Sequence, residues 1–272
     1  DESNVIAVTV RQEFLAGNIS SPQTICYNTV PAQLTSTECS GGDGTYTYQW
    51  QESTDGTNFS NASGTGDTSL NFTPDALAQT TYFRLRYTSG SDCGTQYSNE
   101  IIITVYPDIT AAVINTTTTN EICYNDIPSV ISIQTPASGG NGTFTNQWQV
   151  KNGTVWTDIA GETGTFYQPG NLTVTTLYRL KSTSVYGCGD VLSNEITINV
   201  YSEIDAGIVS GTQTICYNTT PSMFFFTTTP SGAGNTYTYQ WFESDNASTF
   251  TAIPSATYNT YQAGNLTATK YY

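Results

Sequence analysis

The apolar residues of this chain alternate with polar residues over short stretches, and no stretch keeps the 3.6-residue rhythm of an amphipathic helix. Tyr46, Tyr48 and Trp50 alternate with polar residues, so their rings share one face of a predicted strand. Further along, Phe83 and Leu85 alternate with arginines in the same way. The Gly, Asn and Asp residues between such stretches are typical of turns. The pattern predicts an all-β protein.

Three motifs recur along the chain and divide it into repeats. The cysteine motif is QTICYNTVP at 23–31, EICYNDIP at 121–128 and QTICYNTTP at 213–221. The tryptophan motif is TYTYQWQES at 45–53, TFTNQWQVK at 143–151 and TYTYQWFES at 236–244. A third motif, YSNEIIITVYPDI at 97–109 and LSNEITINVYSEI at 192–204, ends a repeat. Successive motifs are about 95 residues apart, the length of an immunoglobulin-like (Ig-like) β-sandwich.

The repeats predict tandem Ig-like β-sandwich domains in an extended rod. Residues 1–12 align with the last strand of the second repeat and are assigned to a preceding repeat. Repeat one is predicted at 13–107 and repeat two at 108–202. Repeat three, at 203–272, stops before its final strands, so we expect the chain to be part of a longer array. The connections lack a Gly/Ser-rich spacer, which favours a semi-rigid rod over flexibly tethered domains.

A tight hairpin is expected after each of the first two tryptophan strands. Asp55 precedes Gly56 in repeat one, and Asn152 precedes Gly153 in repeat two. Both dipeptides suit the two positive-φ positions of a type I′ turn. Beyond the turn, one aromatic residue per repeat is expected to return to the core: Phe59, Trp156 and Phe250.

The cysteines suggest a disulfide in each repeat. Repeat two holds only Cys123 and Cys188, whose counterparts in repeat one are Cys26 and Cys93. The expected disulfides are therefore Cys26–Cys93 and Cys123–Cys188. Paired cysteines in successive repeats indicate an oxidising, extracytoplasmic compartment.

Two cysteines stay unpaired in this scheme. Cys216 occupies the first position of repeat three, and its partner is expected beyond Tyr272. Cys39 has no counterpart in the other repeats. A free thiol, an intermolecular link and a rearranged pairing all remain open for it.

The order of these motifs resembles the Ig-like repeats of very large cell-surface proteins of Bacteroidota, which include gliding-motility adhesins and other substrates of the type IX secretion system. The resemblance covers nearly the whole chain in register. It implies an Ig-like β-sandwich, display on the outer-membrane surface and membership of a long filament or stalk. The matching residues are the four cysteines assigned to disulfides and three core tryptophans: Trp50, Trp148 and Trp241.

Tyr178, preceded by Leu172 and Thr176, looks like a tyrosine corner, in which the phenol hydroxyl bonds back to the backbone at a Greek-key crossing. Tyr272 occupies the same place in repeat three. Phe83 stands there in repeat one and lacks a hydroxyl, so no such bond is expected in that repeat.

Charge and composition argue against several function classes. Seven Lys and Arg against 22 Asp and Glu leave a formal net charge of −15, which disfavours nucleic acids and anionic membranes as partners. Histidine is absent, which excludes imidazole bases and His-ligated metals in this segment. The sequence contains no run of 18 apolar residues, so insertion of a helix into a membrane is not expected. No pair of carboxylates recurs between repeats, so we do not expect an enzyme.

Two binding chemistries compete with a purely structural interpretation. Asp43, Asp67, Asp108 and Asp205 offer hard oxygen ligands for Ca²⁺ at interdomain junctions. No DxDxDG loop is present, and solvated turn carboxylates explain these residues better, so no cofactor is expected. Aromatic rings also suit sugars, but the strand-period tryptophans fit a core. The weaker candidates for ligand contact are the tyrosines beside the first-position cysteines: Tyr27, Tyr124 and Tyr217.

The sequence therefore predicts a non-catalytic structural segment of the stalk or filament of a large extracellular, multi-repeat bacterial surface adhesin. Its expected partners are neighbouring repeats of the same chain, surface glycans or other cell-surface proteins. The alternative is a carbohydrate- or surface-binding module array of a secreted protein, which binding to a glycan array would favour.

Overall fold

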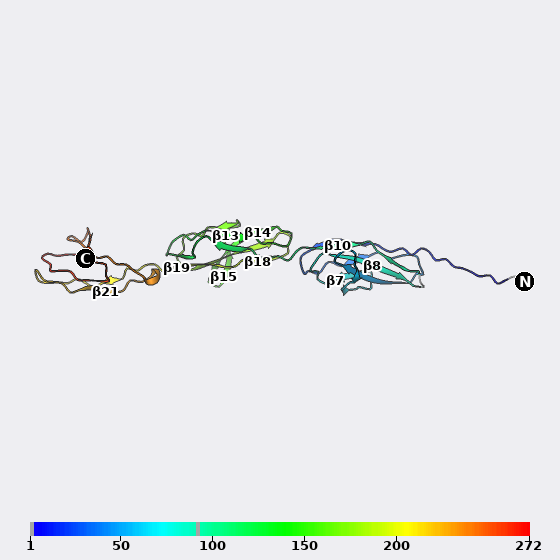
Figure 1. Cartoon of the computed structure of the whole chain (residues 1–272), viewed down its shortest axis with the longest axis horizontal. Helices are drawn as coiled ribbons and strands as arrows, with labels where there is room; N and C mark the ends of the chain where they lie inside the picture. The colour runs from blue at the N-terminus through cyan, green and yellow to red at the C-terminus, as the bar shows by residue number, and fades with distance from the viewer. Residues whose placement is uncertain (1–2, 91–92) are drawn as a thin grey trace.

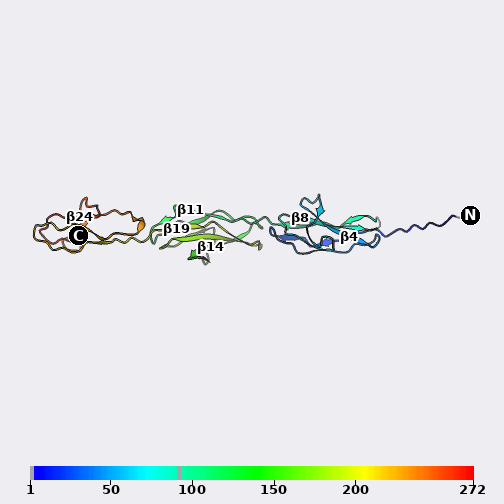
Figure 2. The ribbon, with the colours of Figure 1, turned by 90° about the horizontal axis from the view of Figure 1, so that it is seen from below.

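A computed structural model describes residues 3–90 and 93–272. Three β-rich domains follow one another along one axis, and two perpendicular views show the same rod (Figure 1, Figure 2). An extended N-terminal segment leads into the first domain, and Val5 and Val10 on it are almost fully exposed. The described residues form strands and a single 3-10 turn, with no α-helix among them. The predicted all-β fold of tandem sandwiches is confirmed.

The first domain is a sandwich of two sheets. Its strands are β1 (Ile19–Ser20), β2 (Gln23–Ile25), β3 (Leu34–Ser36), β4 (Tyr46–Ser53), β5 (Ser60–Asn61), β6 (Gly64–Thr65), β7 (Asn71–Pro74), β8 (Thr81–Ser89), β9 (Thr95–Tyr97) and β10 (Ile101–Val105). One sheet has the order β1-β3-β7-β6, and the other has the order β2-β10-β8-β4-β5, with β9 paired to β8. All these pairs are antiparallel except β2 with β10, which run parallel.

The second domain repeats this plan. Its strands are β11 (Val113–Thr116), β12 (Glu121–Ile122), β13 (Ile131–Thr135), β14 (Phe144–Asn152), β15 (Val155–Asp158), β16 (Phe166–Tyr167), β17 (Thr176–Ser184), β18 (Asp190–Leu192) and β19 (Ile196–Val200). The sheets are β11-β13-β16 and β12-β19-β17-β14-β15, with β18 paired to β17. As in the first domain, the short strand β12 runs parallel to the last strand, β19.

The third domain holds counterparts of β11, β13, β14, β15 and β16, of which those of β11, β14 and β15 are shorter. They are β20 (Ile208–Val209), β21 (Phe224–Thr228), β22 (Phe242–Glu243), β23 (Thr251–Ala252) and β24 (Thr260–Tyr261), with the 3-10 turn η1 (Ala233–Asn235) between β21 and β22. Its sheets are β20-β21-β24 and β22-β23.

The repeated tryptophan is at the centre of each core. Trp50 and Trp148 are fully buried, and Trp241 is 8% exposed. Each indole N–H donates to a backbone carbonyl at 2.8–3.0 Å, so a large ring is buried without an unpaired polar atom. Around Trp50 the alternation along β8 buries Phe83 and Leu85, as the sequence pattern predicts.

The hairpins differ from the expected type I′ turns. In the second domain Asn152 pairs with Val155, so Gly153 and Thr154 form a two-residue loop, and only Gly153 of these has a positive φ, of 63°. A positive φ at the first central residue alone is typical of a type II′ turn. In the first domain the loop is longer, because the pairing of β4 with β5 ends at Glu52 and Ser60.

The carboxylate of Asp55 organises that longer loop. Its Oδ1 accepts the backbone N–H of Thr57 at 2.9 Å and of Asn58 at 2.8 Å, and it also accepts the Ser53 hydroxyl. These hydrogen bonds favour the ionised form and hold the pKa of the Asp55 carboxyl well below its usual range. The equivalent residue of the third domain, Asn246, makes the corresponding bonds as a neutral amide.

The replacement Asp55→Asn is expected to destabilise the first domain at pH 7 and to have progressively less effect on acidification. A carboxyl whose pKa is depressed by folding stabilises the fold above its unfolded pKa, and this contribution is lost as the pH falls through the folded pKa. Thermal unfolding of both proteins at pH 7, 4 and 2 measures the difference in Tm. A difference that is the same at all three pH values would contradict this role of the charge.

The aromatic residues after the hairpins do not return to the core. Phe250 is 44% exposed, and Phe59 and Trp156 are half-buried. The guanidinium of Arg84 lies 3.9 Å from the centre of the Phe59 ring, and that of Arg179 lies 4.3 Å from Trp156. These rings cover the outward-facing arginines of β8 and β17, a cation–π arrangement that keeps the charge partly exposed.

The Ser-Asn-Glu residues of the third motif, at 98–100 and 193–195, join the two sheets in the first and second domains. In the second domain the amide of Asn194 accepts the N–H of Ile114 at 2.8 Å and donates to its carbonyl at 2.9 Å. Asn99 makes the same two bonds to Ile19 in the first domain. The asparagine side chain thus provides hydrogen-bond partners for the backbone N–H and C=O groups at the edge of one sheet. The asparagine itself precedes the last strand of the opposite sheet.

The replacement Asn194→Ala is expected to destabilise the second domain by about 2 kcal/mol, because both backbone groups of the buried Ile114 lose their partner. The exposed neighbour Glu195 provides the matched control, Glu195→Ala, with an expected change below about 0.5 kcal/mol. Urea unfolding followed by tryptophan fluorescence measures both. Equal losses for the two variants would contradict the bridging role.

The expected tyrosine corner is not formed at Tyr178. The side chain is buried in the core, where its ring packs 5.5 Å from that of Tyr167. Its hydroxyl makes no hydrogen bond to the backbone within the described residues, and burial raises its pKa to about 12. Tyr272 packs against Phe224 at 4.8 Å in the same way, also without such a bond in the described part of the chain. In both places aromatic packing replaces the predicted hydrogen bond.

Candidate functional site at the junction between repeats

The cysteine motif forms a turn at the far end of each domain. In the first domain the N–H of Thr29 donates to the carbonyl of Cys26 at 3.3 Å, and Asn28 has a φ of 55°. Asn tolerates this left-handed conformation better than most residues, which explains its place in the motif. The N–H of Asn28 also donates to the carbonyl of Leu77 at 2.7 Å, which anchors the turn to the domain.

The second-position cysteine lies at the opposite end of its domain. Cys188 is in the loop between β17 and β18, which the N–H of Ser184 closes by donating to the carbonyl of Gly189 at 3.0 Å. A Cβ placed on Gly189 would lie 3.8 Å from the side chain of Ile109 in the linker. The loop therefore adjoins the segment through which the chain enters the second domain.

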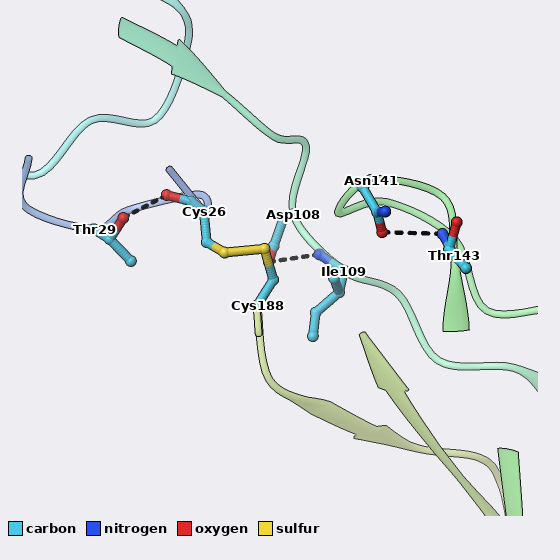
Figure 3. Close-up of a disulfide and its surroundings, with 7 residues drawn as sticks. All are labelled: Cys26, Thr29, Asp108, Ile109, Asn141, Thr143 and Cys188. Atoms are coloured by element: carbon cyan, nitrogen blue, oxygen red, sulfur yellow. Dashed lines mark hydrogen bonds between the residues drawn. A yellow bond between two sulfur atoms is a disulfide. The ribbon is translucent and has the colours of Figure 1, made fainter. Parts of the chain in front are cut away.

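The disulfide joins these two ends across the junction. Cys26 of the first domain is bonded to Cys188 of the second, with 5.4 Å between their Cα atoms. Figure 3 shows the bond beside the linker residues Asp108 and Ile109. The expected pairs within repeats, Cys26–Cys93 and Cys123–Cys188, are wrong, and Cys93 and Cys123 are free thiols.

Strand geometry explains this correction. Ile103 of β10 pairs with Gln23 of β2 on one side and with Thr81, the first residue of β8, on the other. Cys26 directly follows β2, so it lies close to the start of β8. Cys93 lies beyond the other end of β8, a strand of nine residues. Nine residues of strand span about 30 Å. A disulfide needs Cα atoms within about 7 Å, so the two cysteines of one repeat cannot bond in the folded domain.

A glycine pair clamps the linker to the second domain. The N–H of Gly140 donates to the carbonyl of Pro107 at 2.9 Å. Gly139 has a φ of 85°, and a Cβ on it would lie 1.9 Å from the carbonyl oxygen of Asp108. The residue must therefore be glycine for the linker to approach this closely. Thr110 and Ser138 then pair across a β-bridge, with their hydroxyl groups 2.6 Å apart.

An aromatic contact adds to the junction. The rings of Tyr106, just after β10, and Tyr186, in the β17–β18 loop, meet edge to face with centroids 5.5 Å apart. The junction thus combines a covalent bond, backbone hydrogen bonds and one ring contact between the first and second domains. This arrangement holds two neighbouring domains in one orientation.

The same clamp recurs at the other domain entrances. A Cβ on Gly41 would lie 1.8 Å from the carbonyl oxygen of Glu13, and one on Gly232 would lie 1.9 Å from that of Glu203. The matching backbone bonds, Gly42 to Gln12 and Ala233 to Ser202, are both 3.0 Å. The clamp is therefore a property of the repeat and not of one junction.

The remaining cysteines differ in environment. Cys39 is buried in the core of the first domain, and burial raises the pKa of its thiol, which lowers its reactivity. Cys123 and Cys216 are exposed, each in a cysteine-motif turn. Cys39 and Cys216 carry no disulfide within the described chain.

The acidic residues considered for calcium serve turns in the structure. Asp43 accepts the N–H of Thr45, Asp108 accepts that of Ile109, and Asp205 accepts that of Gly207. Asp67 accepts a hydrogen bond from the side chain of Gln49. Within the described residues, no three Cys, Asp or Glu side chains gather as a possible metal site.

An open groove of about 660 Å³ lies on the third domain, lined by the segments 209–217 and 266–272 together with Phe224 and Trp241. In the first domain the equivalent position beside β2 is occupied by the core strand β10. The groove therefore lies where a core strand lies in the first domain, and it is not evidence for a sugar-binding site. Tyr27, Tyr124 and Tyr217, the weaker candidates for ligand contact, are exposed on the three cysteine turns.

Comparisons with known proteins give a family. Three successive stretches, residues 15–107, 112–202 and 205–272, match a model described as "Domain of unknown function (DUF8696)". The chain belongs to this family. Each DUF8696 match contains one cysteine motif and one tryptophan motif. No curated protein matches the chain.

Solved structures with similarity to these DUF8696 domains are tandem β-sandwich arrays. The three N-terminal domains of the bacteriophage RB49 Highly Immunogenic Outer Capsid protein (Hoc) share 11% identity, with 88% of this chain and 79% of that chain covered and a TM-score of 0.33. The chicken CNTN1 FN1–FN3 domains share 13% identity, with 93% and 89% covered and a TM-score of 0.32. The tandem Ig repeats of Dlar share 15%, with 68% and 98% covered and a TM-score of 0.25.

The part of the chain that the structure describes contains no helix of the length and apolarity needed to cross a membrane.

Proposed function

We propose that this chain is a stiff, non-catalytic segment of an extracellular stalk or filament, whose task is to hold a binding part of the same protein away from the cell. The observation that carries the proposal is the Cys26–Cys188 disulfide, which bonds neighbouring domains to each other. A bond of this kind adds nothing to a binding surface, but it removes bending at the junction. Function then depends on shape and length, which a tandem array supplies.

The glycine clamp at each domain entrance and the oxidising compartment that a disulfide implies support the same proposal. Close contact between each linker and a glycine of the next domain leaves no flexible spacer in the rod. A disulfide between exposed turns persists in an oxidising space outside the cytoplasm. The resemblance of the motifs to Ig-like repeats of Bacteroidota surface proteins supports a role in an adhesin exported by the type IX system and attached to the outer membrane.

Small-angle X-ray scattering on the oxidised chain tests the stalk. Domains of about 30–40 Å each, in line, predict a rod with a maximum dimension of about 100 Å or more and a cross-section of one domain. The matched variant Cys188→Ser keeps all three domains and loses the bond, so its profile is expected to show greater bending. A compact particle, or identical flexibility in both proteins, would overturn the proposal. Binding to a glycan array would favour the alternative of a carbohydrate-binding module array.

A further inference from the structure

We propose that the disulfide pattern continues along any array of these repeats, with each first-position cysteine bonded to the second-position cysteine of the next repeat. In this chain Cys26–Cys188 is one such bond. In a longer array, Cys123 would then bond to the second-position cysteine of the third repeat, and Cys93 would bond to the first-position cysteine of a preceding repeat. The inference deepens the proposed stalk, because it makes every junction covalent.

The first-position cysteines are presented identically in all three domains. Asn28, Asn125 and Asn218 have φ values of 55°, 64° and 57°. The N–H of the following residue donates to the cysteine carbonyl at 3.3, 3.2 and 3.3 Å, and the Asn N–H donates to a leucine carbonyl at 2.7, 2.7 and 2.8 Å. Cys123 and Cys216 therefore occupy the same turn, at the same end of a domain, as the bonded Cys26.

The second-position cysteines also share one setting. The N–H of Ser89 closes the loop around Cys93 by donating to Gly94 at 3.1 Å, as Ser184 does to Gly189 around Cys188. A Cβ on Gly42, a residue that clamps the incoming linker, would lie 3.6 Å from the Cβ of Cys93. Cys93 is thus beside the entrance of the first domain, the place that Cys188 holds in the second.

The junction between the second and third domains has the register that such a bond needs. The N–H of Ala233 donates to Ser202 at 3.0 Å, matching that of Gly140 to Pro107 at 2.9 Å. Asp205 and Ser231 form the β-bridge that Thr110 and Ser138 form one junction earlier. A second-position loop on the third repeat would therefore be placed next to Cys123.

Formation of each bond is a two-electron oxidation. Two thiols lose two protons and two electrons and become one disulfide. The electrons pass by thiol–disulfide exchange to an oxidised dithiol oxidoreductase, which is released as its dithiol. The thiols at the two ends of one domain are separated by the length of β8, so folding directs the exchange to the neighbouring repeat.

The chain extended by a copy of its own residues 179–202 after Tyr272 tests this inference. Tyr272 matches Tyr178, so the copy continues the third repeat in register and supplies a copy of Cys188. The change Val191→Ile in the copy alone gives its peptide a distinct mass. Non-reducing peptide mapping is expected to find Cys123 bonded to the copy of Cys188, in addition to the Cys26–Cys188 bond. A bond from the copy to Cys216, or an alkylated Cys123 in the folded protein, would overturn the inference.

A second variant keeps the test decisive if the extended chain does not fold. In the unextended chain, Cys188→Ser removes the partner of Cys26, and both Cys26 and Cys93 are then expected to react completely with an alkylating reagent. A Cys26–Cys93 bond in that variant would overturn the inference. The peptide-mapping and alkylation results are independent of the scattering test of the stalk. A rod can be stiff without further disulfides, so the inference can fail while the proposed stalk stands.

Discussion

Replacing Cys188 with serine is expected to lower the free energy of unfolding of the first two domains by roughly 5 kcal/mol. The Cys26–Cys188 bond closes a loop with a sequence separation of 162 residues, and the chain-entropy relation for a loop of about that length gives this magnitude. The loop contains most of both domains and the linker. The loss is therefore expected to affect both unfolding transitions, and to separate two domains that unfold together in the oxidised protein.

Urea unfolding without reductant measures this loss, with Trp50 and Trp148 as fluorescent reporters of the two cores. The control is Cys216→Ser, which removes an exposed thiol that carries no disulfide. Its expected effect is within about 0.5 kcal/mol. Equal stability of the Cys188→Ser variant and the oxidised native chain would show that the bond is absent or does not constrain the unfolded state.

The replacement Gly139→Ala is expected to destabilise the second domain by about 3 kcal/mol. The new methyl group would lie 1.9 Å from the carbonyl oxygen of Asp108, and the φ of 85° is unfavourable for any residue with a Cβ. The linker must then move away from the turn. This movement breaks the close approach that lets Gly140 bond to Pro107.

The control for this change is Gly170→Ala, because Gly170 has open space around its Cα and no positive φ. We expect it to be neutral or slightly stabilising. Thermal unfolding measures both variants, and scattering shows whether Gly139→Ala also bends the rod. A Gly139→Ala protein as stable and as straight as the native chain would contradict the clamp.

Much of the fold was predictable because it depends on local patterns that repeat. The alternation around Trp50 and Phe83 determines which face of each strand is buried, and the 95-residue spacing matches the sandwich size. The position of Gly139 against Asp108 was not predictable, since a close approach between segments 30 residues apart leaves no mark beyond a Gly-Gly pair. The hairpin at Asp55 was also missed, because its side chain competes with the tight turn by accepting backbone N–H groups.

The disulfide could not be predicted from the equivalence of cysteines between repeats alone. The sequence identifies which cysteines correspond, but pairing depends on which end of the sandwich each one reaches. The directions of the predicted strands indicate which end of the sandwich each cysteine reaches. Cys26 comes at the exit of the domain, and Cys93 follows the long strand β8 back to the entrance. A strand length of about 30 Å then rules out the bond that repeat equivalence suggested.

The central claim is that the disulfide crosses from one repeat to the next, and peptide mapping of the oxidised native chain tests it most directly. Free thiols are alkylated before digestion under non-reducing conditions, and linked peptides are identified by mass spectrometry. The structure predicts one linked pair that contains Cys26 and Cys188, with Cys93 and Cys123 alkylated. Linked pairs of Cys26 with Cys93 and of Cys123 with Cys188 would contradict it.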